Sequence, residues 1–214
     1  SCFKILRKSD EIPYNQNFIL SGMNLAFLGY FANKEVFTKK ILFHWPDGIW
    51  LKKHIEIEKI PGRDLIKKMK IPNHIKKILV LGNLTINSKN FLENKFKLKV
   101  ENKVLPFGNI KKIIRTKIKL TKKTLTLITL PTPKQEKLAF YLSEKNPEYK
   151  IICIGASISI ASGEEKAVPD IMEKFGLEFL WRLRTDTFRR ISRLFVSSRF
   201  YLKGKKNKIY DFWK

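Results

Sequence analysis

The hydrophobic positions of this 214-residue chain fall into short apolar runs that are separated by turn residues and by longer mixed segments. Short continuous apolar runs are typical of buried strands, and mixed segments with a spacing of 3.6 residues are typical of helices. Their alternation predicts an α/β fold, a Rossmann-like, largely parallel sheet flanked by helices. We expect strands at 41–44, 78–81, 125–130 and 151–154, and helices at 63–69, 88–96, 133–143 and 169–175. The Lys-rich stretch 91–119 gives no clear pattern beyond the end of the helix at 88–96.

The pattern changes near residue 176. Residues 187–201 predict one amphipathic helix, with an apolar face that includes Phe188 and Phe195 and an arginine face that includes Arg189 and Arg193. We therefore expect a Rossmann-like catalytic core over residues 1–175 and a basic, amphipathic, membrane-associating helical appendage over residues 176–214.

Charge adds a second signal. The chain contains 44 Lys and Arg residues but only 19 Asp and Glu residues, which gives a net charge of +25. A protein this basic is attracted to a polyanion, either nucleic acid or an anionic lipid surface. The lysines of the first 150 residues are equally well explained by an AT-rich genome. The arginines are different, since six lie between Arg182 and Arg199 and only three lie in residues 1–170. This clustering favours a membrane-binding appendage over a solvated helix packed on the core.

Cysteine and histidine content narrows the chemistry. The two cysteines, Cys2 and Cys153, cannot form a disulfide framework, and the three scattered histidines lack the spacing of a zinc site. We expect no metal and no cofactor. The run 151–162 is too short and too polar to span a bilayer, and no secretion signal is recognisable. The expected location is cytoplasmic, peripheral on the inner face of the bacterial cell membrane.

The first turn with candidate chemistry is Pro46-Asp47-Gly48, directly after the strand expected at 41–44. Pro46 fixes one backbone angle and Gly48 permits a sharp turn, so Asp47 is presented at a strand end. In parallel α/β sheets ligands bind at that end of the strands, and a carboxylate there can serve as a general base. Taken alone, Pro-Asp-Gly is also a common turn sequence.

The second turn, residues 132–136, predicts a helix start with a capping box. Thr132 would be the N-cap, Pro133 the first helical residue, and Gln135 would reach back to the Thr132 amide. Free amides at this helix start, with Lys134 beside them, would suit a diphosphate. A third turn after the strand at 151–154 contains Gly155, which permits either close approach to a ligand or tight packing. Neither a GxGxxG nor a GxxxxGK[ST] loop is present.

Together these motifs resemble the WecG/TagA/CpsF glycosyltransferases (glycosyltransferase family 26). The specific part runs from Pro133 to Leu183, through Gly155 and the Gly-Leu-Glu-Phe-Leu-Trp-Arg-Leu block that begins at Gly176. Upstream, Pro46-Asp47-Gly48 and residues 60–65 look like the family's Asp-Gly and Gly-x-Asp-Leu motifs. The resemblance covers most of the chain from about residue 18.

This resemblance implies an inverting enzyme of cell-surface polysaccharide synthesis. It would move a sugar (an N-acetylhexosamine, mannosamine-type or uronic acid) from a UDP-sugar to a polyprenyl-diphosphate-linked acceptor, with Asp47 as the catalytic base. The candidate substrate-binding residues are Asn24, Lys59, Lys134, Gln135, Glu136 and Gly155. The arginines implied to meet the lipid diphosphate and the membrane are Arg182, Arg184, Arg189, Arg190 and Arg193.

Four positions depart from the family pattern. Gly22 replaces the usual Thr and Lys59 the usual Arg, Ser159 replaces a frequent Asp, and Ala167 replaces an Arg. A catalytically inactive family member acting as a partner subunit is therefore one alternative, and a basic nucleic-acid-binding protein is another. The intact Asp47 and Gln135 favour an active enzyme whose partners are the UDP-sugar, the lipid-linked acceptor and an anionic membrane, without nucleic acid. A homo-oligomer stays an open alternative.

Overall fold

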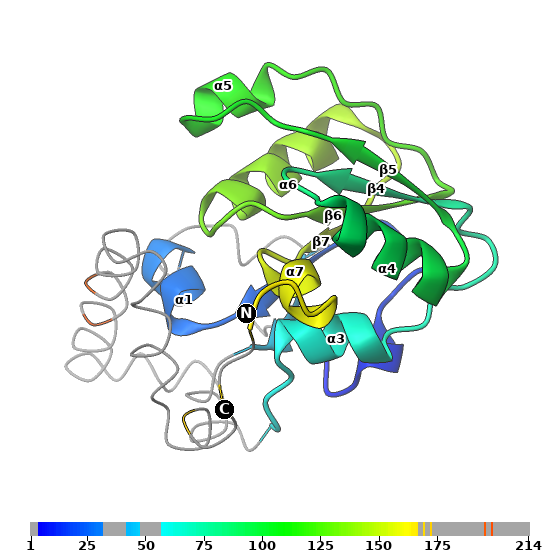
Figure 1. Ribbon diagram of the computed structural model, residues 1–214. Helices are drawn as coiled ribbons and strands as arrows, with labels where there is room; N and C mark the ends of the chain where they lie inside the picture. Colours follow the sequence, from blue (N-terminus) through cyan, green and yellow to red (C-terminus); the bar gives the residue numbers. More distant parts are fainter. Residues whose placement is uncertain are drawn as a thin grey trace.

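The computed structural model describes residues 4–31, 42–47 and 57–166, together with the isolated residues 169, 172, 195 and 198. Seven strands of this part form one sheet with the order β1-β3-β2-β7-β6-β4-β5 (Figure 1). Every pairing between neighbouring strands is parallel. The strands are β1 (Lys4–Ile5), β2 (Phe18–Met23), β3 (Leu42–Pro46), β4 (Lys77–Leu81), β5 (Lys99–Lys103), β6 (Thr124–Ile128) and β7 (Lys150–Cys153). The predicted α/β fold with a parallel sheet is confirmed.

Helices cover both faces of the sheet (Figure 1). On one face, α3, α4 and α7 contribute Leu65, Leu92 and Ile158 to the core. On the other face, α1 and α6 contribute Phe27 and Leu138 to a second core cluster. The helices are α1 (Leu25–Phe31), α3 (Gly62–Lys68), α4 (Ile86–Phe96), α5 (Ile110–Ile114), α6 (Lys134–Lys145) and α7 (Ser157–Ala161), with a short 3-10 helix η1 (Ser9–Glu11).

Burial on both faces explains why the central strands are apolar along their whole length. In β2, Phe18 and Leu20 join the core cluster under α3, whereas Ile19 and Met23 join the cluster under α1 and α6. All six residues of β2 are buried. Such strands end abruptly at polar turns, and these turns come together at the carboxyl edge of the sheet.

The strands expected at 41–44, 78–81, 125–130 and 151–154 correspond to β3, β4, β6 and β7. The helices expected at 63–69, 88–96 and 133–143 correspond to α3, α4 and α6. The unassigned stretch 91–119 contains β5 and α5 as well as the end of α4. The helices expected at 169–175 and 187–201, and with them the appendage 176–214, lie almost wholly outside the described residues. No helix within the described ranges is both long enough and apolar enough to cross a membrane.

Candidate functional site

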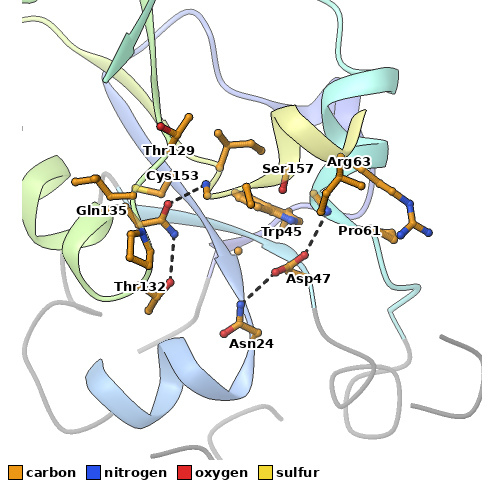
Figure 2. Close-up of a pocket in the computed structure, with 18 of the residues that line it drawn as sticks. Asn24, Trp45, Asp47, Pro61, Arg63, Thr129, Thr132, Gln135, Cys153 and Ser157 are labelled. Atoms are coloured by element: carbon orange, nitrogen blue, oxygen red, sulfur yellow. Dashed lines mark hydrogen bonds between the residues drawn. The ribbon is translucent and has the colours of Figure 1, made fainter. Parts of the chain in front are cut away.

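A polar cavity of about 240 Å³ lies at the carboxyl edge of the sheet, where β2, β3, β6 and β7 end (Figure 2). In parallel α/β sheets this edge is where ligands bind. Five of the candidate site residues line the cavity: Asn24, Asp47, Lys59, Gln135 and Gly155. Thr132, from the turn expected at 132–136, also lines the cavity, and residues outside the candidate set complete much of the wall: Trp45, Arg63, Thr129, Cys153 and Ser157.

Asp47 is placed by the pairing of β2 with β3. The register sets Gly22 opposite Trp45 and Met23 opposite Pro46, and the Asp47 backbone amide then donates to the Met23 carbonyl at 3.3 Å. The Asp47 carboxylate accepts from Asn24 Nδ2 at 3.1 Å and from the Gly62 backbone N–H at 3.3 Å (Figure 2). The carboxylate is thereby oriented on one side by Asn24, which lies between β2 and α1, and on the other by the start of α3.

The orientation of the Asn24 amide is fixed by the helix that follows it. Asn24 Oδ1 accepts from the Phe27 backbone N–H at 3.0 Å, and the Asn24 carbonyl accepts from Leu28, so Asn24 caps the start of α1. Because a backbone N–H can only donate, the amide oxygen must face Phe27. The Nδ2 group is therefore the one that faces Asp47.

Gly62 permits α3 to approach α7 closely. A Cβ atom at this position would lie 2.1 Å from Ser157 Oγ, a separation that real Cβ atoms do not show. Any other residue would push the start of α3 away from α7 and remove the Gly62 N–H from Asp47. The glycine of the Gly-x-Asp-Leu motif is therefore explained by the close packing of α3 against Ser157, next to the candidate base.

On the opposite side of the cavity, Gln135 is held by three hydrogen bonds. Its Oε1 accepts from the Gly155 N–H at 3.1 Å, and its Nε2 donates to Thr132 Oγ1 at 3.2 Å and to Glu136 Oε1 at 2.9 Å. Gly155 itself has a φ of 58°, in the left-handed region that glycine adopts without strain. Both amide hydrogens of Gln135 are used within the protein, so toward a ligand Gln135 can act only as an acceptor through Oε1.

Glu136 lies behind the cavity wall and is fully buried. Its Oε1 accepts from Ser21 Oγ at 2.9 Å and from Thr132 Oγ1 at 3.0 Å, in addition to Gln135. Its Oε2 has no hydrogen-bond partner among the described residues. Burial raises the pKa of Glu136, and burial next to Glu136 raises the pKa of the Cys153 thiol well above its ordinary value. Glu136 therefore supports Gln135 and Thr132 rather than lining the cavity.

The predicted capping box is wrong. The N-cap of α6 is Pro133, without a side-chain cap, after a cis peptide bond between Thr132 and Pro133. The backbone N–H groups of Lys134 and Gln135 both donate to the Pro131 carbonyl. These amides are not available to a diphosphate as predicted. The capping pattern failed because the Thr132 hydroxyl bonds the buried Glu136 carboxyl instead of a helix amide.

Lys134 also lies elsewhere than predicted. Its Nζ donates to the Gly108 carbonyl at 2.6 Å, in the loop before α5. Among the described residues, the cations that line the cavity are Lys59 and Arg63. Arg63 was missed as a site residue because it was treated as the first residue of a helix. The signal that could have found it is its place next to Gly62, at a helix start that faces the end of β3.

The space around Gly22, which stands where the family usually has Thr, is filled by neighbouring side chains. A Cβ at Gly22 would lie 3.0 Å from Asp47 Cβ and 3.0 Å from Trp45 Cζ2. The buried Trp45 indole therefore occupies space next to the position where the family usually has a threonine side chain. Ser159 lies in α7, where its hydroxyl donates to the Ala156 carbonyl at 2.8 Å. Ala167 and the five candidate arginines lie outside the described residues.

The described residues include no cluster of three or more metal-binding side chains. The parallel sheet and the polar cavity at its carboxyl edge place the chain among α/β proteins that bind their ligands at strand ends. The chain matches the model of the glycosyl transferase WecG/TagA/CpsF family over residues 49–209, and it belongs to that glycosyltransferase family. The match includes Lys59, Gln135 and Gly155 and begins two residues after Asp47. No curated protein matches the chain.

Proposed function

We propose that the protein is an inverting glycosyltransferase that moves a sugar from a UDP-sugar to a polyprenyl-diphosphate-linked acceptor in cell-surface polysaccharide synthesis. The observation that carries the proposal is the oriented carboxylate of Asp47 in a polar cavity at the carboxyl edge of the sheet. Asn24 and Gly62 hold this carboxylate from two sides, as a general base requires. The sugar transferred would be an N-acetylhexosamine, mannosamine-type or uronic acid.

In the proposed reaction, Asp47 accepts the proton of the acceptor hydroxyl while the hydroxyl oxygen attacks the anomeric carbon of the donor sugar. The bond from that carbon to the UDP oxygen breaks, and UDP leaves with the bonding electrons. Lys59 and Arg63 bring positive charge to a cavity that must receive diphosphate groups. Gln135 accepts a hydrogen bond from a hydroxyl or N–H group of the bound substrate through its Oε1.

An acceptor of this kind lies in a membrane, so the proposal places the protein on the inner face of the bacterial cell membrane. The five candidate arginines between Arg182 and Arg193 would contact the lipid diphosphate. Their contribution is a prediction from the sequence.

The test compares Asp47→Asn with wild type. Transfer from UDP-N-acetylmannosamine, UDP-N-acetylglucosamine and UDP-N-acetylmannosaminuronic acid to a polyprenyl-diphosphate-linked N-acetylglucosamine is followed by UDP release and by lipid-linked product. We expect Asp47→Asn to lower kcat by roughly 10²-fold or more while the thermal unfolding midpoint changes little. Asp10→Asn in η1 is the matched control, since it removes the same charge from an exposed position.

Turnover by Asp47→Asn close to that of wild type would refute the assignment of the base. A wild-type protein that releases UDP from none of these donors, yet binds RNA or DNA with a steep salt dependence, would refute the proposed function as a whole.

A further inference from the structure

The loop between β5 and α5 presents apolar side chains to solvent. Phe107 is 99% exposed and Val104 is 66% exposed, while Leu105 between them is buried in the core. Exposed apolar residues that occur singly are ordinary, but those that lie close together in one loop are typical of an interaction surface. A fully exposed phenylalanine contributes nothing to the packing of the fold.

The exposure of Phe107 is fixed by the contacts around it. Next in the chain, Gly108 has a φ of 132°, a conformation that favours glycine, and its carbonyl accepts from Lys134 Nζ at 2.6 Å. Asn109 then caps α5 by accepting from the Lys112 backbone N–H at 3.1 Å. With Leu105 buried on one side and this cap on the other, the chain holds Phe107 outward.

The surroundings of this loop are strongly cationic. Residues 102–135 contain nine Lys and Arg residues and no Asp or Glu. The Lys112 side chain passes close to Gly108, and Lys103 Nζ donates to the Lys117 carbonyl at 2.5 Å. We call Val104 and Phe107, with the cations that follow them, the β5–α5 patch; its exposed cations are Lys111, Lys112, Arg115, Lys117 and Lys119.

The β5–α5 patch lies on the same edge of the sheet as the cavity. Its loop follows the carboxyl end of β5, and the bond from Lys134 to Gly108 ties it to the start of α6. The next residue of α6 is Gln135, which lines the cavity. Figure 1 shows α5 beyond the strand ends, above α6. A surface that contacts the patch would therefore lie near the mouth of the cavity.

We propose that the β5–α5 patch docks on an anionic lipid bilayer, with Phe107 and Val104 at headgroup depth and the cations against the lipid phosphates. Exposed apolar side chains accompanied by nearby cations are what binding at such an interface requires. Single-stranded nucleic acid would need several aromatic faces for stacking, and Phe107 is the one aromatic residue in 102–135. The inference rests on the proposed function only in that a lipid-linked acceptor requires an approach to the membrane.

The experiment uses the full chain and vesicles of phosphatidylcholine with or without phosphatidylglycerol, and measures partitioning by flotation. We expect Phe107→Ser to weaken partitioning to anionic vesicles roughly fivefold or more, because an apolar side chain leaves the interface. Replacing Lys111 and Lys112 by Gln should weaken it further at low salt and little at high salt. None of these positions is buried, so the fold is not at risk.

Ile86→Ser is the matched control. Ile86 is 67% exposed, but its neighbour Thr85 hydrogen-bonds the carboxylate of Glu164, and an acidic neighbour opposes an anionic surface. This variant should partition like wild type. In a second experiment, Phe107 or Ile86 is replaced by Trp and the added tryptophan fluorescence is measured on vesicles that contain brominated lipids. These lipids should quench the fluorescence of a tryptophan at position 107 but not that of a tryptophan at position 86.

Three results would overturn the inference: equal flotation of Phe107→Ser and wild type, a loss confined to RNA or DNA binding, or a loss confined to self-association in sedimentation. Flotation needs no sugar donor, so its outcome is separate from that of the transfer assay. Binding through Phe107 without sugar transfer would refute the proposed function alone. Sugar transfer with unchanged flotation of Phe107→Ser would refute this inference alone.

Discussion

Replacing Glu136 by leucine removes an oxygen that accepts hydrogen bonds from three buried donors. The resulting loss in the free energy of unfolding can be estimated from these bonds. Ser21, Thr132 and Gln135 all donate to Glu136 Oε1 at 2.9 to 3.0 Å. Leaving a buried donor unsatisfied costs about 1–3 kcal/mol. Three such donors, offset by the burial of an apolar leucine, predict a loss of roughly 2–5 kcal/mol in the free energy of unfolding.

Glu136→Gln is the informative comparison, because its side-chain oxygen can accept the same three bonds. We expect its free energy of unfolding to lie within about 1 kcal/mol of wild type at pH 5. Burial raises the pKa of Glu136 above its ordinary value of 4.5. The folded state thus holds a proton that the unfolded state releases above pH 4.5, and wild-type stability falls as the pH rises toward the raised pKa. Glu136→Gln has no such proton, so its stability relative to wild type should increase over that range.

The assays are urea unfolding between pH 5 and pH 8 and UDP-sugar kinetics. Glu136→Leu frees one hydrogen of the Gln135 amide, so the amide can turn away from Gly155. We expect KM for the UDP-sugar to rise about tenfold in Glu136→Leu and to change little in Glu136→Gln. Equal impairment of the two variants would refute the reasoning, because it would show that an acceptor oxygen at position 136 is not sufficient to hold Gln135.

Two further predictions concern the β2–β3 pair. Gly22→Thr should lower both the free energy of unfolding and the activity, because its Cβ would lie 3.0 Å from Asp47 Cβ and from Trp45 Cζ2. Adding Trp45→Val should restore part of the loss. A double-mutant cycle that shows no coupling between the two positions would contradict this prediction. Burial lowers the pKa of His44 to about 3, so only the unfolded state gains a proton between pH 6.5 and 3, and stability falls as the pH drops through that range. The full loss is on the order of 5 kcal/mol, and His44→Leu should flatten the acid limb of the unfolding free energy against pH.

Much of the fold is predictable because parallel strands that are covered on both faces leave continuous apolar runs in the sequence. β4, β6 and β7 have such runs. β2 was missed since Ser21 and Gly22 interrupt its run, and Ser21 is buried only because Glu136, 115 residues away, accepts its hydrogen bond. β5 was missed because Val100 is its one buried residue, at an edge of the sheet.

The candidate site was partly predictable for a similar reason. Asp47 and Gly155 follow strands, and a strand end in a parallel sheet is a strong positional signal. The hydrogen bonding of the turn at 132–136 was not predictable from local sequence, because Thr132 has two competing partners. A helix amide is the local one, and the Glu136 carboxyl is the one the structure selects. The spacing of residues along the chain predicts the bond to the helix amide, but it does not reveal that the Glu136 carboxyl is buried.

The geometry of the cavity constrains how the proposed reaction uses it. In an inverting displacement, the base and the leaving group lie on opposite sides of the anomeric carbon. Lys59 and Arg63 belong to the segment that packs against the end of β3, since Ile60 N–H donates to the Pro46 carbonyl and Gly62 N–H donates to Asp47. These cations therefore lie on the side of the base, where the acceptor enters, and in the proposed reaction they are suited to the acceptor diphosphate.

The UDP leaving group must then depart toward the opposite wall, where Gln135 lies (Figure 2) and accepts a hydrogen bond from the Gly155 N–H. Gln135 presents a carbonyl oxygen there, and two oxygens that both accept hydrogen bonds repel each other. A phosphate oxygen of UDP cannot bond to it, but a ribose hydroxyl, a sugar hydroxyl or the uracil N–H can. The turn at 132–136, first predicted to bind a diphosphate, is accordingly suited to the neutral, hydrogen-donating parts of the nucleotide sugar.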